Sequence, residues 1–134
     1  MSAVQNLSYA LVQIAHNFGA VAAVGGSLAA ARFHAQDKRN VLAKIALIGL
    51  AVQAASGALF GAVSHFYYGR FPDISGIALL ALEIKIACVI AGCALLSAVL
   101  FMKRMQAHRQ LLFVASSLLA VTALAAAAVL RWYS

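Results

Sequence analysis

Residues 75–102 read SGIALLALEIKIACVIAGCALLSAVLFM, and only Glu83 and Lys85 in this stretch are charged. A helix needs about 20 mainly apolar residues to cross the hydrocarbon core of a bilayer. Inside that core every backbone N–H and C=O group must find its partner within the protein, so a single spanning segment must be helical. The stretch therefore predicts a membrane-spanning α-helix.

Three further apolar runs, at residues 7–31, 41–64 and 111–130, are long enough to span a bilayer by the same criterion. Short polar loops separate the runs, and the chain lacks the alternating ten-residue segments that are typical of a membrane β-barrel. We predict an all-α fold, an integral membrane antiparallel four-helix bundle, that forms a single domain over residues 1–134.

Small residues indicate how these helices pack, because membrane helices associate through positions where their backbones can approach closely. The second run carries Gly57 and Gly61 in a G-x-x-x-G pattern. The first run has Gly26 with Ala22 and Ala30 at four-residue spacing. We expect both patterns to lie in helix–helix contacts.

The composition also fits a lipid environment. Of the 134 residues, 65% are hydrophobic and 10% are charged, whereas soluble domains average roughly 45–50% apolar and about 25% charged residues. The formal net charge is +7. The basic residues lie in short loops between apolar runs, which favours lipid headgroups over nucleic acid as their neighbours. Cys88 and Cys93 point in different directions on one helix, so no disulfide between them is expected.

Lysine and arginine are concentrated in two of the three loop regions. The first region holds Arg32, Lys38, Arg39 and Lys44, and the third holds Lys103, Arg104 and Arg109. The middle loop holds only Arg70, and the N-terminal tail holds neither residue type. Because cytoplasmic loops are enriched in lysine and arginine, we expect loops one and three to be cytoplasmic. The middle loop and both termini would then be periplasmic, an N-out/C-out arrangement in a bacterial inner membrane.

Three ionisable residues lie well inside the predicted spans, namely His16, Glu83 and Lys85. Each costs on the order of 2.5–3.5 kcal/mol in the bilayer, so each indicates a function. At the rise of an α-helix, His16 lies roughly 14 Å and Lys85 roughly 15 Å below the outer ends of their helices. Gln53 falls near the middle of the second helix. These three side chains are therefore candidates for one polar layer, with Gln13 and Asn17 flanking His16.

Glu83 and Lys85 are two residues apart and face nearly opposite directions on a helix. We favour Lys85 inward, on the side of Cys88, and Glu83 toward a partner chain. For His16 and Lys85, a purely structural role remains an alternative to a functional one. His16 is either a ligand or proton-handling group or a packing residue that is hydrogen-bonded to Gln53 or Ser56, and Lys85 either serves a site or snorkels to the interface.

A family resemblance rests on a few of these residues. Residues 16–26 read HNFGAVAAVGG, with Arg32 six residues beyond Gly26. This pattern resembles the first helix of HemJ-type protoporphyrinogen oxidases, and Lys85 in its L-x-x-K context resembles their third helix. The outline is also similar to the four-helix unit of CopD-like copper-resistance proteins. The chain departs from both families at Ala23, where an aromatic residue is usual, and from HemJ-type proteins in having no histidine after Lys85 in the third helix.

The resemblance implies haem b with His16 as its ligand and Lys85 as a functional partner, hence catalytic roles for both. We accordingly expect haem b or quinone redox chemistry between the first and third helices, with Gln13, Asn17 and Gln53 lining the site. An enzyme of this kind would be a membrane oxidoreductase. His65 lies too near the outer surface to supply a second haem ligand at the depth of His16.

Two other functions remain as alternatives. The first is a non-catalytic accessory subunit of a larger membrane complex, which the short loops and the position of Glu83 favour. The second is copper or proton transport, which the CopD-like outline suggests. In each case we expect either a homo-oligomer or a subunit of a larger membrane assembly.

Overall fold

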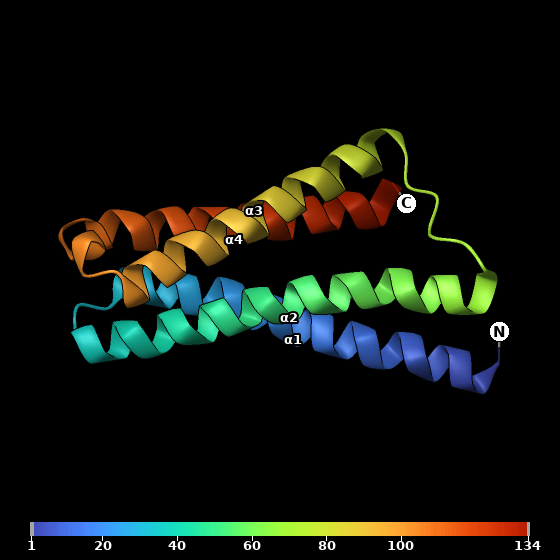
Figure 1. Cartoon of the computed structure of the whole chain (residues 1–134), viewed down its shortest axis with the longest axis horizontal. Coiled ribbons are helices and arrows are strands. Elements are labelled where there is room, and N and C mark those ends of the chain that lie inside the picture. The colour runs from blue at the N-terminus through green and yellow to red at the C-terminus, as the bar shows by residue number, and fades with distance from the viewer. Residues whose placement is uncertain (1, 134) are drawn as a thin grey trace.

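The computed structural model describes residues 2–133, and its helices confirm the all-α, four-helix prediction (Figure 1). The helices are α1 (Ala3–Arg32), α2 (Gln36–Tyr68), α3 (Gly76–Phe101) and α4 (Arg109–Tyr133), with a short 3₁₀ helix η1 (Lys103–His108) before α4. All four α-helices are long and apolar enough to cross a membrane.

The four helices form an antiparallel bundle made of two pairs. α1 packs along α2 and α3 packs along α4, while α1 also contacts α4 and α2 contacts α3, so α1 and α3 are diagonally opposed. Both termini and the segment that joins α2 to α3 lie at one end of the bundle, which we call the terminal end (Figure 1). The short connections α1–α2 and α3–α4 lie at the other end, which we call the basic end. The two pairs diverge toward the terminal end (Figure 1).

Helix α2 is longer than the predicted run 41–64 at both ends. It begins at Gln36, because the polar residues of the predicted loop form its first turn, with Asp37 at the favourable N-terminal position. It continues to Tyr68 and ends at Gly69, whose φ of 69° is the left-handed conformation common after a helix end. The backbone N–H of Gly69 donates to the carbonyl of His65 at 2.9 Å.

The other boundaries move by smaller amounts. α1 begins at Ala3 rather than residue 7, α3 covers Gly76–Phe101, and α4 extends to Tyr133 rather than residue 130. The loop predicted between the third and fourth runs is mostly the 3₁₀ helix η1, and α4 already begins at Arg109. The polar residues at these ends thus continue the helices that the apolar runs begin.

Close backbone contact occurs between α1 and α2, at Gly26 and Gly49. A Cβ atom at Gly26 would lie 2.9 Å from the backbone N of Ala46, and a Cβ at Gly49 would overlap the backbone of Ala23. The expectation for Gly57 and Gly61 is wrong, because a Cβ at Gly57 would meet nothing within 4 Å and one at Gly61 would meet only the ring of Phe71. Within residues 2–133 of a single chain, the G-x-x-x-G pattern therefore does not mediate a helix–helix contact.

The tightly packed core lies toward the basic end. Six apolar residues there are fully buried, and they are Ala30, Ala43, Ala46, Leu96, Val99 and Phe113. They come from the last turns of α1 and α3 and the first turns of α2 and α4, which meet at that end. Large apolar side chains cover much of the outer surface instead, including Phe18, Val21 and Ile90, as a lipid-facing surface requires.

Candidate functional site

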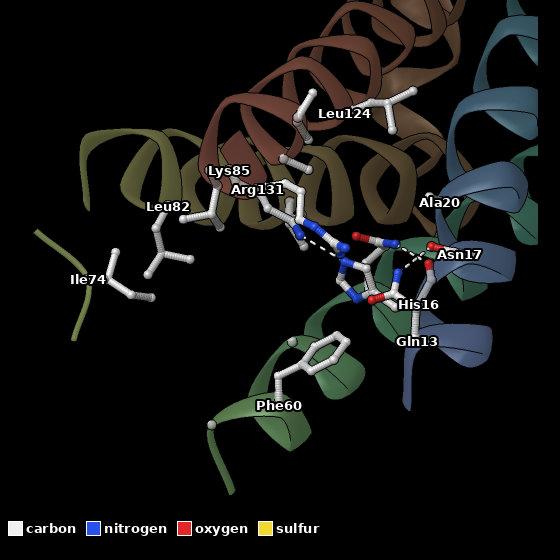
Figure 2. A pocket seen from close by; sticks show the side chains of 18 of the residues that line it. Gln13, His16, Asn17, Ala20, Phe60, Ile74, Leu82, Lys85, Leu124 and Arg131 are labelled. Atoms are coloured by element: carbon white, nitrogen blue, oxygen red, sulfur yellow. Dashed lines mark hydrogen bonds between the residues drawn. The ribbon is translucent and has the colours of Figure 1, made fainter. Parts of the chain in front are cut away.

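The side chains of His16 and Lys85 meet inside the bundle. Nζ of Lys85 lies 2.9 Å from Nε2 of His16, across the diagonal between α1 and α3 (Figure 2). Both side chains are half-buried, whereas Glu83, two residues before Lys85, is exposed on the outer surface. Of the two charged residues of α3, the structure therefore directs Lys85 to the interior, on the same side of α3 as the buried Cys88.

Helix α2 holds the imidazole of His16 through Ser56. Nδ1 of His16 lies 2.7 Å from Oγ of Ser56, and the Ser56 hydroxyl donates to the carbonyl of Val52 at 2.6 Å. A serine hydroxyl has one proton to donate, so Nδ1 of His16 carries the proton and donates to Ser56. This network assigns the neutral tautomer in which Nε2 keeps its lone pair and accepts from Lys85.

Two further contacts fix the surroundings of His16. The buried side chain of Gln53 donates from Nε2 to the backbone carbonyl of His16. The ring of Phe60 lies 5.7 Å from the imidazole, with the two planes inclined at 74°, which is an edge-to-face arrangement. Residues of α2 thus contact the backbone carbonyl, the Nδ1 atom and the ring of His16.

The other predicted site residues lie on the same wall but make no recorded hydrogen bond to His16 or Lys85. Nε2 of Gln13 donates to Oδ1 of Asn17 at 2.7 Å (Figure 2). This pair lies one turn apart on α1, and both residues line the cavity described below. The predicted polar layer is therefore present, and within it the His16–Lys85 contact and the Gln13–Asn17 contact are separate.

A cavity of about 1000 Å³ surrounds these side chains and extends toward the terminal end. All four helices and the segment between α2 and α3 form its wall, which includes Leu50, Leu79, Leu82, Val89, Leu124 and Leu130 among its apolar residues. Its charged residues are Lys85, Asp73 and Arg131, and its glycines are Gly57 and Gly61. A large apolar pocket with a few convergent polar groups is the usual form of a small-molecule or cofactor site.

Two residues of this site lie outside the predicted set. Ser56 was noted only as a packing partner of His16, although it determines the tautomer of the imidazole. Arg131 directly follows the fourth predicted span and is not among the predicted site residues, yet it lines the cavity (Figure 2). A signal for Arg131 was available, because Ala120, Ala123 and Ala127 precede it on one face of α4 at helical spacing, and all three line the cavity.

Among the residues that line the cavity, His16 is the only histidine, and there is no cysteine. Within residues 2–133, no group of three or more His, Cys, Asp or Glu residues is arranged to hold a metal ion. His65 is exposed, and its ring lies 4.9 Å from that of Phe71 at the terminal end. Cys88 and Cys93 are free thiols, as their directions on α3 predict, and neither lines the cavity.

The residues present fit haem b with one protein ligand. The lone pair on Nε2 of His16, which accepts from Lys85, could ligate iron if Lys85 moved aside. The hydrogen bond from Nδ1 is the support that metal-ligating histidines usually receive. The apolar wall would suit a porphyrin face, and Lys85 and Arg131 would supply two cations for its carboxylates. The residues that line the cavity include no second imidazole, so a single chain would provide one histidine ligand.

Comparison with known proteins adds no relative. No family model matches the chain, and neither a curated protein nor a solved structure matches it. The likeness to HemJ-type and CopD-like proteins therefore stays a prediction that rests on residues 16–26, Arg32 and the L-x-x-K pattern that ends at Lys85.

Proposed function

We propose that this protein is a redox membrane protein that binds haem b in the cavity between its two helix pairs. One observation carries the proposal. A neutral imidazole, fixed by Ser56, accepts a hydrogen bond from Lys85 through Nε2 at 2.9 Å, and the two side chains line an apolar cavity of about 1000 Å³. Burying a lysine and a histidine together in a membrane bundle is costly, and a bound cofactor would offset that cost.

The roles of the chain's own residues follow from this arrangement. Ligation through Nε2 would use the lone pair that accepts the Lys85 hydrogen bond, so binding would release Lys85 to pair with an anionic group. Ser56 would keep the imidazole in the ligating tautomer, and Gln53 would hold the backbone of α1 in place. Haem b, when bound, would supply one-electron transfer.

A quinone is the second candidate for the same cavity. Its body is apolar, and its carbonyl oxygens accept hydrogen bonds, which the amine of Lys85 can donate. A protonated lysine would also stabilise the negative charge of a semiquinone.

The test is an absorption spectrum and an organic extract of the protein purified in mild detergent from haem-replete cells. A stoichiometric Soret band that disappears in His16→Ala and persists in His65→Ala would support haem b. A colourless preparation with stoichiometric quinone would support the second cofactor. A folded preparation that holds neither would overturn the proposal.

Glu83 favours one alternative, a subunit of a larger membrane complex. Its carboxyl group is exposed on α3 between apolar side chains, among them Ile84 and Leu80, and such a group requires a partner in the hydrocarbon region. A partner helix with a basic or hydrogen-bonding residue would provide one. Co-purification with stoichiometric partner chains that is lost in Glu83→Leu and retained in Ile86→Leu would support this function, whereas a lone monomer in mild detergent would contradict it.

The distribution of basic residues supports the orientation that we propose. The basic end carries Lys38, Arg39, Lys103, Arg104 and Arg109, whereas the terminal end carries Arg70 and Arg131. By the positive-inside rule the basic end would be cytoplasmic and both termini periplasmic. We propose that the membrane is a bacterial inner membrane, with the termini on its periplasmic side.

A further inference from the structure

Two arginines meet at the basic end, far from the cavity, and both pack on the ring of Phe113. Cζ of Arg39 lies 4.5 Å and Cζ of Arg109 lies 5.8 Å from the centroid of that ring. Phe113 is fully buried, so it fixes both guanidinium groups at one place where α2 and α4 begin. Two positive charges held on one ring repel each other, and an anion between or beside them would offset this repulsion.

The hydrogen bonds of these arginines position them without neutralising them. Arg39 donates from Nε to the carbonyl of Ala30 at 3.1 Å and from Nη2 to Oε1 of Gln110 at 2.7 Å. Arg109 donates to the amide oxygens of Asn40 and Gln106. Every acceptor recorded for the two groups among residues 2–133 is a neutral oxygen, and each guanidinium has five donors, so charge and donors both remain.

The helix geometry adds to the unbalanced positive charge. Arg109 is the first residue of α4, whose first turn holds no acidic residue. Arg39 lies in the first turn of α2, where Asp37 offsets part of the charge. A helix N-terminus carries partial positive charge, which disfavours cations and favours anions. In addition, Nε of Arg109 is buried with no hydrogen-bond partner within the described residues. Structural capping of α1 by Arg39 explains one of the contacts but does not explain why Arg109 lies beside it.

We propose that Arg39 and Arg109 form a binding site for the phosphate group of an anionic phospholipid. The position supports a lipid source, because the site lies at the ends of membrane-spanning helices, where headgroups lie, and exposed Lys103 and Arg104 are on the adjoining η1. Basic pockets between membrane helices are typical sites for anionic headgroups. Guanidinium groups suit phosphate because two parallel N–H donors match two of its oxygens.

The test is native mass spectrometry of the delipidated protein, titrated with phosphatidylglycerol, with phosphatidylcholine and with inorganic phosphate. We expect phosphatidylglycerol to bind about tenfold or more tightly than phosphatidylcholine. Both lipids carry the phosphate, but the choline cation cancels its charge and is repelled by the two arginines. The double variant Arg39→Gln with Arg109→Gln should lose that preference. The control Lys103→Gln with Arg104→Gln removes the same charge from exposed positions and should keep most of it.

The outcomes separate the possible explanations. An equal loss in both double variants would mean a diffuse surface charge effect and would overturn the proposed site. Saturation by inorganic phosphate alone, with no added affinity for phosphatidylglycerol, would keep the phosphate site but overturn its lipid source. Should the glutamine variant fail to fold, Arg39→Lys with Arg109→Lys replaces it. That variant keeps both charges and loses the paired donors, so an unchanged affinity for phosphatidylglycerol would contradict recognition by guanidinium groups.

Discussion

Nζ of Lys85 lies 2.9 Å from Nε2 of His16, although 69 residues separate the two positions in the chain. Their helices are diagonally opposed, so the contact crosses the interior of the bundle rather than a helix–helix interface. Ser56 orients the histidine from a third helix. The pair therefore depends on the relative positions of α1, α2 and α3 at once, which makes it sensitive to whatever enters the cavity beside it.

We predict that Lys85→Met weakens cofactor binding by on the order of tenfold, because it removes the cation that would pair with an anionic group of the ligand. Binding is measured by titrating haem, or a soluble quinone, into protein freed of its cofactor. Glu83→Gln is the matched control on the same helix, since its side chain lies outside the cavity. Equal affinities of Lys85→Met and the unaltered protein would show that Lys85 does not contribute to binding.

The spans and the polar layer could be predicted from sequence, because apolar length and depth depend only on the rise of a helix. The rotation of each helix about its axis could not be predicted in this way, because it depends on the neighbouring helices. Glu83 and Lys85 point apart whichever one faces inward, and the choice depends on which side of α3 meets α2 and α4. Gly57 shows the same limit, because its pattern suits packing but its face of α2 lines the cavity.

The hydrogen-bond network around His16 could be predicted only in part from the sequence. Gln53 and Ser56 were possible partners because they lie near the depth of His16, but depth alone does not say which atom each would contact. The structure assigns Gln53 to the backbone carbonyl and Ser56 to Nδ1. Such contacts depend on the distance and relative rotation of two helices, which the sequence of one helix does not determine.

Ser56→Ala removes the acceptor that holds Nδ1 of His16 and leaves the ring free to change tautomer or rotate. Loss of such a supporting hydrogen bond typically costs about 10–100-fold in metal affinity. We expect a loss of that order in haem affinity, together with an altered Soret position. Ser116→Ala is the matched control, because that buried serine donates only to the Leu112 carbonyl of its own helix. Equal effects of the two substitutions would assign the loss to helix packing instead.

Adjacent glycines in α1 provide a test of the α1–α2 contact. Gly26→Ala places a methyl group 2.9 Å from backbone atoms of α2, at Ala46 and Leu42, and we expect a destabilisation of about 1–3 kcal/mol from overpacking. Gly25→Ala meets nothing within 4 Å, so it should be neutral or stabilise the helix by up to about 1 kcal/mol. Thermal unfolding in detergent, followed by circular dichroism, compares the two. Similar midpoints for both variants would contradict the close helix contact.

The proposed orientation predicts opposite labelling of the two ends of the bundle. Asp73 lies between α2 and α3 at the terminal end, and Lys103 begins η1 at the basic end; both are exposed. In a background where Cys88 and Cys93 are replaced by alanine, Asp73→Cys should react with a membrane-impermeant maleimide in intact cells, because its thiol would face the periplasm. Lys103→Cys should react only after the membrane is opened, because the positive-inside rule places its thiol in the cytoplasm. The reverse pattern would invert the orientation and leave the bundle unchanged, whereas labelling of both in intact cells would mean that the chain inserts in two directions.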